Sequence, residues 1–432
     1  MKWELTPLKN ITTKIGSGAT PRGGENSYQA EGITLIRSLN VYDFEFKYDG
    51  LAFIDEKQAL ETRLARVIVK PQDLLLNITG ASVARCCIVP EHLLPARVNQ
   101  HVMLVRVDSN HADPYYVLYC INGPVYKTQL LTLAQGGTTR EALTKEIIGN
   151  FEIPLPPLPT QRKIAAVLSA YDDLIDNNTR RIQILEEMAR AIYREWFVHF
   201  RFPGHETVKL VESAVGLIPE GGEVKTLGEA CEIVMGQSPK SEFYNETGEG
   251  LPFHQGVKDF GQRFPTDRVY CTVQNRIAEA GDILFSVRAP VGRINIANKR
   301  IVIGRGLCAI RDKNENQAFI FHQLKEKFQE EDIMGGGTIF KAVTKADMLG
   351  IQIILPTGSL IAKFEQIAKP IFSELENLTA KNANLRRTRD LLLPKLISGE
   401  IDVSDVDIDI GFQNINQDDT FPAAAVSTYS RP

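Results

Sequence analysis

The most regular pattern of apolar positions in the chain is a stripe along residues 160–200. Its members recur at alternating steps of four and three residues, which is the 3.5-residue period of a coiled-coil seam. They are Ile164, Leu168, Tyr171, Ile175, Asn178, Ile182, Leu185, Ala189, Ile192 and Trp196. The stripe predicts one long helix, roughly 55 Å long if it holds roughly 35–40 residues at about 1.5 Å per residue.

The same stripe returns 200 residues later, with eight of its ten positions apolar. Its members are Phe364, Ala368, Ile371, Leu375, Leu378, Asn382, Leu385, Arg389, Leu392 and Leu396. Each copy has one Asn on the seam, where a polar residue costs stability and fixes register or orientation. A single stripe would indicate an ordinary core helix, but two copies in matching register predict a coiled coil. Pro370 removes a backbone donor, so we expect a bend there or a helix that begins properly only after it.

The segments outside the stripes read as short strands separated by Gly and Pro. In the first half the strand-like runs are residues 33–36, 67–69, 73–76 and 101–105, and residues 113–133 are the helical exception. A proline-rich linker at 153–159 then leads into the first long helix, and its prolines make it stiff and extended.

The second half of the chain replays the landmarks of the first. Asp73-Leu74-Leu75 returns as Asp282-Ile283-Leu284, Ala81–Arg85 as Ala289–Arg293, Gln135–Thr138 as Gly335–Thr338, Leu143-Thr144-Lys145 as Val343-Thr344-Lys345, and the linker as Ile353–Pro356. Between these landmarks the residues differ freely. The two halves are therefore expected to share a scaffold and to differ in the side chains between the landmarks.

This organisation predicts an α+β protein with two strand-rich domains and two long helices. The expected segments are a first domain at 1–155, a central helical region at 156–203, a second domain at 204–357, a C-terminal long helix at 358–400 and an acidic, disordered tail at 401–432.

Composition adds constraints on compartment and partners. No apolar run reaches the ~18–20 residues that span a membrane, and the N-terminus does not open a signal peptide, so we expect a cytoplasmic protein without membrane contact. The six cysteines include no C-x-x-C pair, which favours reduced structural thiols over a zinc site. The net charge is −4, and residues 1–155 hold 16 basic and 16 acidic residues. Any basic surface must therefore be local.

Catalytic motifs are missing from the sequence. There is no Gly-Lys dipeptide for a phosphate loop, no H-E-x-x-H, no G-x-S-x-G and no paired Cys/His spacing. Asp113-Pro114-Tyr115-Tyr116 is only faintly similar to the acidic-Pro-Pro-aromatic loop of amino-methyltransferases, because it lacks the second proline and opens a helix. We therefore expect a protein that is not an enzyme by itself and that holds no cofactor and no metal.

Polar side chains on matched turns are the remaining candidates for function. Arg and Lys read guanine edges, Asn and Gln read adenine, and hydroxyls and Gly-rich turns approach phosphates. Each signal is weak alone, but repetition at matched places with altered residues favours DNA reading. The candidate DNA contacts are Arg22, Arg37, Asn40, Asn77, Thr79, Ser82, Arg85, Gln100, Gln135, Gly136, Gly137 and Thr138 in the first half, and Gln237, Ser238, His254, Gln255, Lys258, Arg288, Arg293, Arg305, Gly336, Gly337, Thr338 and Lys341 in the second.

The amino-acid sequence of the two helices resembles that of the specificity subunits of type I restriction–modification systems. The resembling residues are the linker and helix start Ile153–Ala165, the run Asp172–Asn178, Arg194–Val198 and the C-terminal stretch Leu391–Ile401. The second linker departs from the pattern, with Thr357-Gly358-Ser359-Leu360 where a Pro-x-x-Gln is usual.

The resemblance implies a function and a set of partners. Each domain would read one half of a split, asymmetric site in double-stranded DNA, and the helices would pair as an antiparallel coiled coil that fixes the spacing. Two methyltransferase subunits would carry S-adenosylmethionine and methylate adenine, and restriction subunits would carry out ATP-driven translocation and cleavage with Mg. The expected docking residues are Ile192, Tyr193, Trp196 and Phe197, taken to be exposed at one end of the helix pair, together with Leu392, Leu393 and Leu396.

Two other functions compete with this interpretation. A self-sufficient methyltransferase is disfavoured by the missing cofactor and catalytic motifs. A coiled-coil scaffold unconnected to DNA is disfavoured because most of the chain lies in two strand-rich domains.

Overall fold

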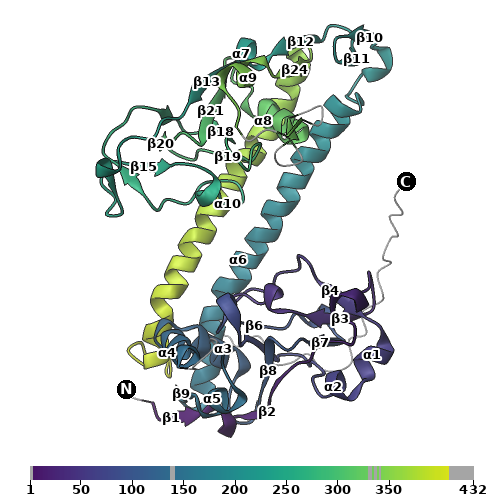
Figure 1. Cartoon of the computed structure of the whole chain (residues 1–432). Coiled ribbons are helices and arrows are strands. Elements are labelled where there is room, and N and C mark those ends of the chain that lie inside the picture. Colours follow the sequence, from purple (N-terminus) through teal and green to yellow (C-terminus); the bar gives the residue numbers. More distant parts are fainter. Residues whose placement is uncertain (1–2, 137–141, 329–332, 335–337, 340–341, 408–432) are drawn as a thin grey trace. The chain divides into compact units, whose positions relative to one another are not determined.

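The computed structural model describes residues 3–136, 142–328, 333–334, 338–339 and 342–407 (Figure 1). Its contacts divide the chain into two compact units. Unit 1 holds residues 1–177 and 382–432, and unit 2 holds residues 178–381. Each unit contains one strand-rich domain together with a part of each long helix, so the two expected domains belong to different units.

The first domain is built on an antiparallel sheet in the order β2 (Thr12–Ser17), β8 (Val102–Val107), β5 (Leu74–Asn77) and β6 (Cys86–Ile88). Side chains alternate between its faces, so Leu74 and Leu76 enter one core while Leu75 enters another. Because both faces are buried, the strands read as continuous apolar runs. Figure 1 shows α3 (Pro114–Asn122), α4 (Pro124–Gln135) and α5 (Lys145–Asn150) on one side of this sheet and β3, β4 and β7 on the other.

A second, three-stranded sheet completes the first domain. Its order is β4 (Ala52–Ile54), β3 (Ile33–Ile36) and β7 (Ala96–Val98), and β3 runs parallel to β7. Strands at 33–36, 73–76 and 101–105 are thus confirmed, as is helix over 113–133, which is broken at Gly123. The strand predicted at 67–69 is wrong. Val67 and Val69 are buried, but only Ile68 forms an isolated bridge, after the short helices α1 (Glu56–Leu60) and α2 (Thr62–Ala65).

Unit 2 repeats both sheets. The order β13 (Cys231–Met235), β21 (Leu307–Asp312), β18 (Ile283–Ser286) and β19 (Ile294–Ile296) matches that of the first domain. The second sheet has the order β14 (Tyr244–Asn245), β16 (Tyr270–Cys271), β15 (Leu251–His254), β20 (Ile301–Ile303) and β17 (Ile277–Ala278). Its β15–β20 pair is parallel, as is β3–β7. The shared scaffold predicted from the repeated landmarks is confirmed.

The remaining elements follow the same repeat. β1 (Leu5–Pro7) pairs with β9 (Glu152–Pro154), and β12 (Glu223–Thr226) pairs with β24 (Gln352–Leu355). Thr144 caps α5 and Thr344 caps α9 (Lys345–Gly350). Unit 2 also contains β10 (Leu210–Ser213), β11 (Gly216–Pro219), α7 (Leu227–Ala230), α8 (Gln317–Lys327), β22 (Ile333–Met334) and β23 (Thr338–Ile339).

The two stripes form the long helices α6 (Leu158–Tyr193) and α10 (Gly358–Ser398). A π-helical turn, Arg194–Val198, follows α6. Helix α10 begins well before Pro370, so the expected start after that residue is wrong. Pro370 lies on the exposed side, while Phe364, Ala368 and Ile371 bury the opposite face and hold the helix in place.

The helices pair antiparallel within each unit. In unit 1, Asn382 Nδ2 donates to the Ile175 carbonyl at 3.3 Å, and Arg389, further along α10, pairs with Asp172, which comes earlier in α6. In unit 2, Arg181 Nη2 lies 3.0 Å from Glu374 Oε1. The seam residues Ile182, Ala189, Ile371, Leu375 and Leu378 form one buried cluster there. The predicted coiled coil is confirmed, and Asn382 makes the seam contact expected of a register-fixing residue.

Within the described residues, no helix is long and apolar enough to cross a membrane, and no group of three or more His, Cys, Asp or Glu side chains is placed to hold a metal ion. All six cysteines are free and buried. Burial raises the pKa of the Cys231 thiol to about 12 and raises the pKa of the Cys86 thiol further, so these thiols stay protonated.

Candidate nucleic-acid interface

Each domain contains the same pattern of backbone hydrogen bonds within itself, so the loops of the two domains can be matched position by position. Ile78 N donates to His101 O at 3.0 Å, and Val287 N donates to Gly306 O at the same distance. The next residues, Thr79 and Arg288, form isolated bridges to Ala142 and Ala342. Thr79 and Arg288 therefore occupy the same place, just after β5 and β18.

A second matched place follows the parallel strand pair of each domain. Val102 N donates to Asn99 O at 3.2 Å, and Leu307 N donates to Gly304 O at 3.0 Å. These turns enclose Gln100 in the first domain and Arg305 in the second. In the second domain the turn needs small residues, because a Cβ on Gly306 would lie 2.4 Å from Gln255 O.

Two further places lie beside this turn. Asn99 N donates to Ile36 O and Gly304 N donates to His254 O, so the following residues, Arg37 and Gln255, correspond. Ala19 N donates to Val98 O and Gln237 N to Ile303 O, which brings Gln237 and Ser238 to the same group of loops. Ser238 Oγ accepts a hydrogen bond from Arg305 N at 3.3 Å.

In the second domain these loops surround a hollow of about 600 Å³. Its polar lining includes Gln255, Lys258, Arg268, Arg288 and Arg305, all exposed. Arg268 Nε pairs with Asp259 Oδ1 at 2.6 Å, whereas the side chains of Lys258, Arg288 and Arg305 have no hydrogen-bonding or ion-pair partner within the described part of the chain. Tyr244 and Phe253, stacked at 4.6 Å, also line the hollow. Unpartnered cations beside a rigid wall are suited to base edges and phosphates.

The first domain carries a different set of groups at the matched places. Thr79 Oγ1 lies 2.7 Å from His101 Nδ1, and Gln100 Nε2 lies 2.8 Å from His101 Nε2. The Arg37 guanidinium lies over the Tyr28 ring at 5.2 Å and pairs with Glu25 at 3.5 Å, so it is committed to its own domain. Arg85 lies over Tyr42 at 4.4 Å. This set offers hydroxyl, amide and imidazole groups where the second domain offers guanidinium groups.

Three candidate DNA contacts are wrong because their side chains are fully buried. Asn40 Nδ2 donates to Lys47 O at 2.9 Å and to Asp49 O at 3.2 Å, which closes a loop. Asn77 Nδ2 donates to Ser38 O at 2.9 Å. His254 Nε2 lies 3.1 Å from Asp267 Oδ1. The two asparagines satisfy backbone carbonyls and the histidine pairs with a carboxylate, roles that their residue types do not reveal.

The other candidates are dispersed. Arg22 is exposed and pairs with Glu61 at 3.4 Å, Ser82 is half-buried, and Arg293 is exposed on the turn before β19. Gln135 and Gly136 end α4 and are exposed. Thr338 lies in β23. Gly137, Thr138, Gly336, Gly337 and Lys341 lie outside the described residues.

The expected exposure of the partner-binding residues is also wrong. Tyr193 and Phe197 belong to the core of unit 2, where Phe197 packs on Phe319 at 4.9 Å and on Phe364 at 5.4 Å. Leu393 and Leu396 belong to the core of unit 1. Ile192, Trp196 and Leu392 are half-buried against these same cores. The helix ends carry bulky apolar groups because each domain packs on them. The exposed large apolar residues of the long helices α6 and α10 are Leu174, Ile184, Met188, Ile367 and Leu391.

Residue-type reasoning missed His101, Arg268, Tyr244 and Phe253. His101 adjoins Gln100 and would follow from matching the two turns before β8 and β21. The other three come from strands and turns with no repeated landmark, so no signal in a single sequence places them beside Arg288. Asp113 caps α3 by accepting from Tyr116 N at 2.9 Å, which leaves it no role in a methyltransferase loop.

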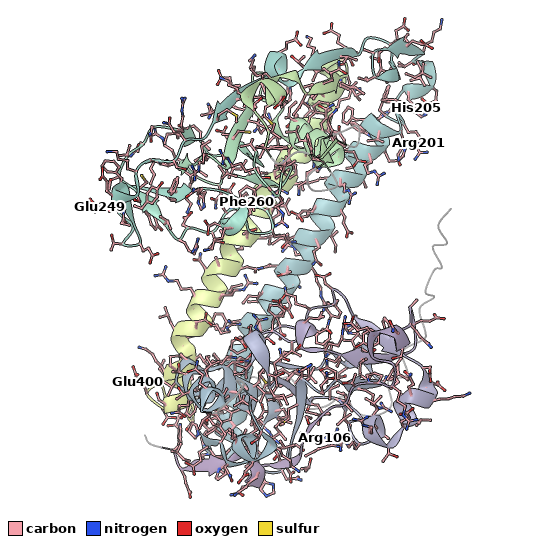
Figure 2. The ribbon with its side chains drawn as sticks, viewed as in Figure 1. Arg106, Arg201, His205, Glu249, Phe260 and Glu400 are labelled. Atoms are coloured by element: carbon pink, nitrogen blue, oxygen red, sulfur yellow. The ribbon has the colours of Figure 1, made fainter. Side chains whose placement is uncertain are left out.

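β5 and β18 are each anchored by an ion pair whose carboxylate is buried. Asp73 Oδ1 and Oδ2 each lie 2.7 Å from the Arg106 guanidinium, and the Asp282 oxygens lie 2.7 and 2.8 Å from Arg311 (Arg106 is labelled in Figure 2). Asp73 also accepts from Lys70 N, and Asp282 from Glu279 N. These bidentate pairs hold β5 against β8 and β18 against β21, so the loops that follow start from fixed positions.

Comparison with known proteins finds the same family twice along the chain. A family model described as the type I restriction modification DNA specificity domain matches residues 2–187 and 219–388. A Methanocaldococcus jannaschii protein, named as a candidate MjaX type I restriction enzyme specificity subunit, is 30% identical over 93% of this chain and 94% of its own. The HindI type I restriction enzyme specificity subunit of Haemophilus influenzae is 23% identical over 78% of this chain and 88% of its own.

A solved structure has a similar fold. It is the S subunit of a type I restriction-modification system from M. genitalium, with a TM-score of 0.58 and 16% sequence identity, and the match covers 91% of this chain and 96% of the other.

Proposed function

We propose a function for this chain on the premise that it belongs to the type I restriction modification DNA specificity family. It is the non-catalytic subunit that selects DNA sequences for a type I restriction–modification complex. Each strand-rich domain contacts one half of a bipartite, asymmetric site, and the paired helices set the spacing between the halves.

One observation carries this proposal: the domains have the same backbone scaffold and different side chains at the same loop positions. Arg288 replaces Thr79, and Arg305 replaces Gln100. Arginine makes bidentate contacts to guanine, while amides and hydroxyls suit other edges. A repeated scaffold with exchanged reading groups is what recognition of two different half-sites requires.

The partners are DNA, methyltransferase subunits and restriction subunits. We infer that two methyltransferase subunits bind the helices, at the exposed apolar residues Leu174 and Leu391 of unit 1 and Ile184, Met188 and Ile367 of unit 2. S-adenosylmethionine, ATP and Mg then belong to the partner subunits, and this chain needs no cofactor.

Domain exchange tests the division of labour. Residues 1–155 are replaced by the corresponding domain of another family member, and the chimera is co-expressed with the methyltransferase subunits. Sequencing of methylated adenines should show one half of the recognised sequence changed and the other half kept, with the spacer unchanged. A change in both halves contradicts separate reading. Methylation without this chain would favour a self-sufficient partner.

A further inference from the structure

Each domain carries a matched loop that reaches the long helices. We call residues 41–46 and 260–265 the tip loops. Val41 bridges to Phe46, and Phe260 bridges to Pro265 (Phe260 is labelled in Figure 2). Inside them Tyr42 N donates to Glu45 O at 3.0 Å, and Gly261 N donates to Phe264 O at 3.1 Å. Phe44 and Arg263 therefore stand at the same position.

In unit 1 the tip loop presents an aromatic ring to the helices. The Arg389 guanidinium of α10 lies 4.2 Å from the centroid of the Phe44 ring. The same guanidinium pairs with Asp172 of α6, and the Arg389 side chain is only 9% exposed. Phe44 has a φ of 63°, a left-handed backbone conformation that is costly for a bulky residue. We call Phe44, Arg389 and Asp172 the first latch.

In unit 2 the same interaction has its partners exchanged. Arg263, now on the tip loop, lies with its guanidinium 4.1 Å from the centroid of the Phe372 ring of α10. Its Nη1 lies 3.2 Å from Glu186 Oε1 of α6, and its side chain is 6% exposed. We call Arg263, Phe372 and Glu186 the second latch. Along the two stripes Phe372 follows Asp172 by 200 residues, so it occupies the matched position of the second helix.

Such latches are poor choices for stability alone. Burying a guanidinium removes its hydration, and apolar side chains of the same volume often hold a protein core equally well. Nε and Nη2 of Arg263 are buried and have no hydrogen-bond partner among the described residues, although the ring contacts offset part of this loss. Each guanidinium lies between a carboxylate of α6 and an aromatic ring, which permits few other arrangements, although Arg389 also pairs with Asp390 and Arg263 also lies over Phe321. The same device built twice, with opposite polarity, suits a role in orientation.

We propose that the two latches position each recognition domain in one orientation on its own helix segments, and that this orientation makes the spacing between the DNA half-sites strict. The inference rests on the proposed function. Phe44, Arg389, Arg263 and Phe372 are positioning residues in this scheme: they touch no DNA and act through the domain that they hold.

The exchanged polarity provides a direct test in unit 1. Phe44→Arg places two guanidinium groups together, and Arg389→Phe removes the guanidinium from Asp172, which keeps its hydrogen bond from the Tyr119 hydroxyl. The double variant F44R/R389F recreates the polarity of the second latch, with a loop arginine stacked on a helix phenylalanine and facing a carboxylate. Each variant is co-expressed as a full chain with the methyltransferase subunits, and methylated adenines are mapped genome-wide.

The single variants should keep the half-site sequences but lose spacer strictness. We expect methylation at spacers one base pair shorter or longer to rise at least about tenfold relative to the natural spacer. The double variant should return this ratio to within about threefold of the parent. Strict spacing in both single variants, or a double variant no stricter than they are, would overturn the proposal.

Two further variants distinguish an effect on domain orientation from an effect on folding. Phe44→Leu keeps an apolar side chain, although a smaller one, and removes the ring, so it should fold normally and still relax the spacer. Arg181→Ala removes the exposed helix–helix ion pair to Glu374 and should leave the spacer strict. Altered half-site bases in F44R would mean that the latch shapes readout and would overturn the positioning role. A parent chain that directs no bipartite methylation would instead refute the proposed function itself.

Discussion

At the residue scale, the two domains keep side chains that fix the scaffold and change those that face solvent. Asp73 and Asp282 both start a central strand, and each is paired with an arginine on the neighbouring strand. Thr79 and Arg288 come at the ends of those strands, where backbone geometry is fixed and the side chain is free to vary. Binding specificity can therefore change at these positions without a change in the core.

Exchanging the matched residues provides a prediction for the second domain. Arg288→Thr and Arg305→Gln place the first domain's side chains on the second scaffold. Loss of one bidentate guanine contact costs about 1–3 kcal/mol, so affinity for the natural site should fall about 5- to 150-fold per substitution. Oligonucleotide binding at constant salt measures this fall, and mapping of methylated adenines shows which half-site relaxes.

The control for this pair is Arg300→Ala, which removes an exposed arginine paired with Glu279 in the same domain. It should leave the recognised sequence unchanged. If Arg288→Thr weakens binding to all DNA sequences equally and lowers the salt dependence, the arginine contacts phosphate and not a base.

At the element scale, the long helices serve as the surface on which each domain folds. α8 packs its aromatic face on both helices of unit 2. The His322 ring stacks on Tyr193 at 5.6 Å and touches Phe364 and Phe372 at 5.9 and 5.8 Å. Its Nε2 is buried without a hydrogen-bond partner in the described part of the chain. The neutral His322 imidazole therefore packs as an aromatic ring among the rings of Tyr193, Phe364 and Phe372.

The buried imidazole makes unit 2 sensitive to acid. Burial, together with the smaller effect of the nearby charges of Arg263, Lys325 and Arg190, lowers the pKa of His322 to about 3. The unfolded chain takes up this proton near its ordinary pKa of about 6.5, so the stabilising contribution is present above that pH and is lost as pH falls towards 3. At about 1.36 kcal/mol per pKa unit, the loss is on the order of a few kcal/mol.

His322→Phe should therefore flatten the fall in stability between about pH 6.5 and pH 4. Denaturant unfolding of the full chain, followed through aromatic fluorescence at several pH values, measures this slope. The control is His199→Gln, which alters an exposed histidine just after the π-helical turn that follows α6 and should keep the parent slope. An unchanged slope in His322→Phe would place the acid-sensitive group elsewhere.

Element order and helix pairing were predictable because they depend on local periodicity. The four-three alternation of the stripes identifies both helices, and apolar runs between Gly and Pro locate most strands. Helix α10 shows the limit of local rules: Pro370 should disturb it, yet Phe364 and Ile371 bury the opposite face and hold the helix continuous. Tyr193 and Phe197 were mistaken for docking residues because a stripe does not reveal that a domain folds back on it.

At the scale of the whole molecule, function depends on a repeat whose copies differ locally. Although the net charge of the chain is −4, arginine and lysine side chains line the hollow of the second domain. The loop that holds Arg288 could be predicted as a candidate because landmarks repeat on both sides of it. The latches could not be predicted, because the residues that meet in them are far apart in the sequence: Phe44 contacts Arg389, and Arg263 contacts Phe372. Arg389 was nevertheless visible as a charged residue on an apolar seam.

The paired helices also predict how spacing responds to length. Ile175 contacts Asn382 in unit 1 and Arg181 contacts Glu374 in unit 2, so the antiparallel pairing is seen on either side of 178–182 and 378–382. Seven residues should therefore be inserted in both places, between Asn178 and Ile182 and between Leu378 and Asn382. A heptad in each helix keeps both seams in phase, whereas a heptad in one helix alone shifts its partner out of register.

The double insertion lengthens the helices by about 10 Å at ~1.5 Å per residue, which corresponds to up to about three base pairs at ~3.4 Å each. Half-site sequences should stay the same while the spacer lengthens, because the reading loops are untouched. Each added base pair also turns the second half-site by about 34° for a ~10.5 bp turn, so total methylation should fall. Four-residue insertions break the four-three alternation and should lengthen the spacer by about one or two base pairs in a less stable protein. The methylated motif of each variant in cells is the measurement. An unaltered spacer in an active double-insertion variant would mean that the partner subunits, and not these helices, set the distance between the half-sites.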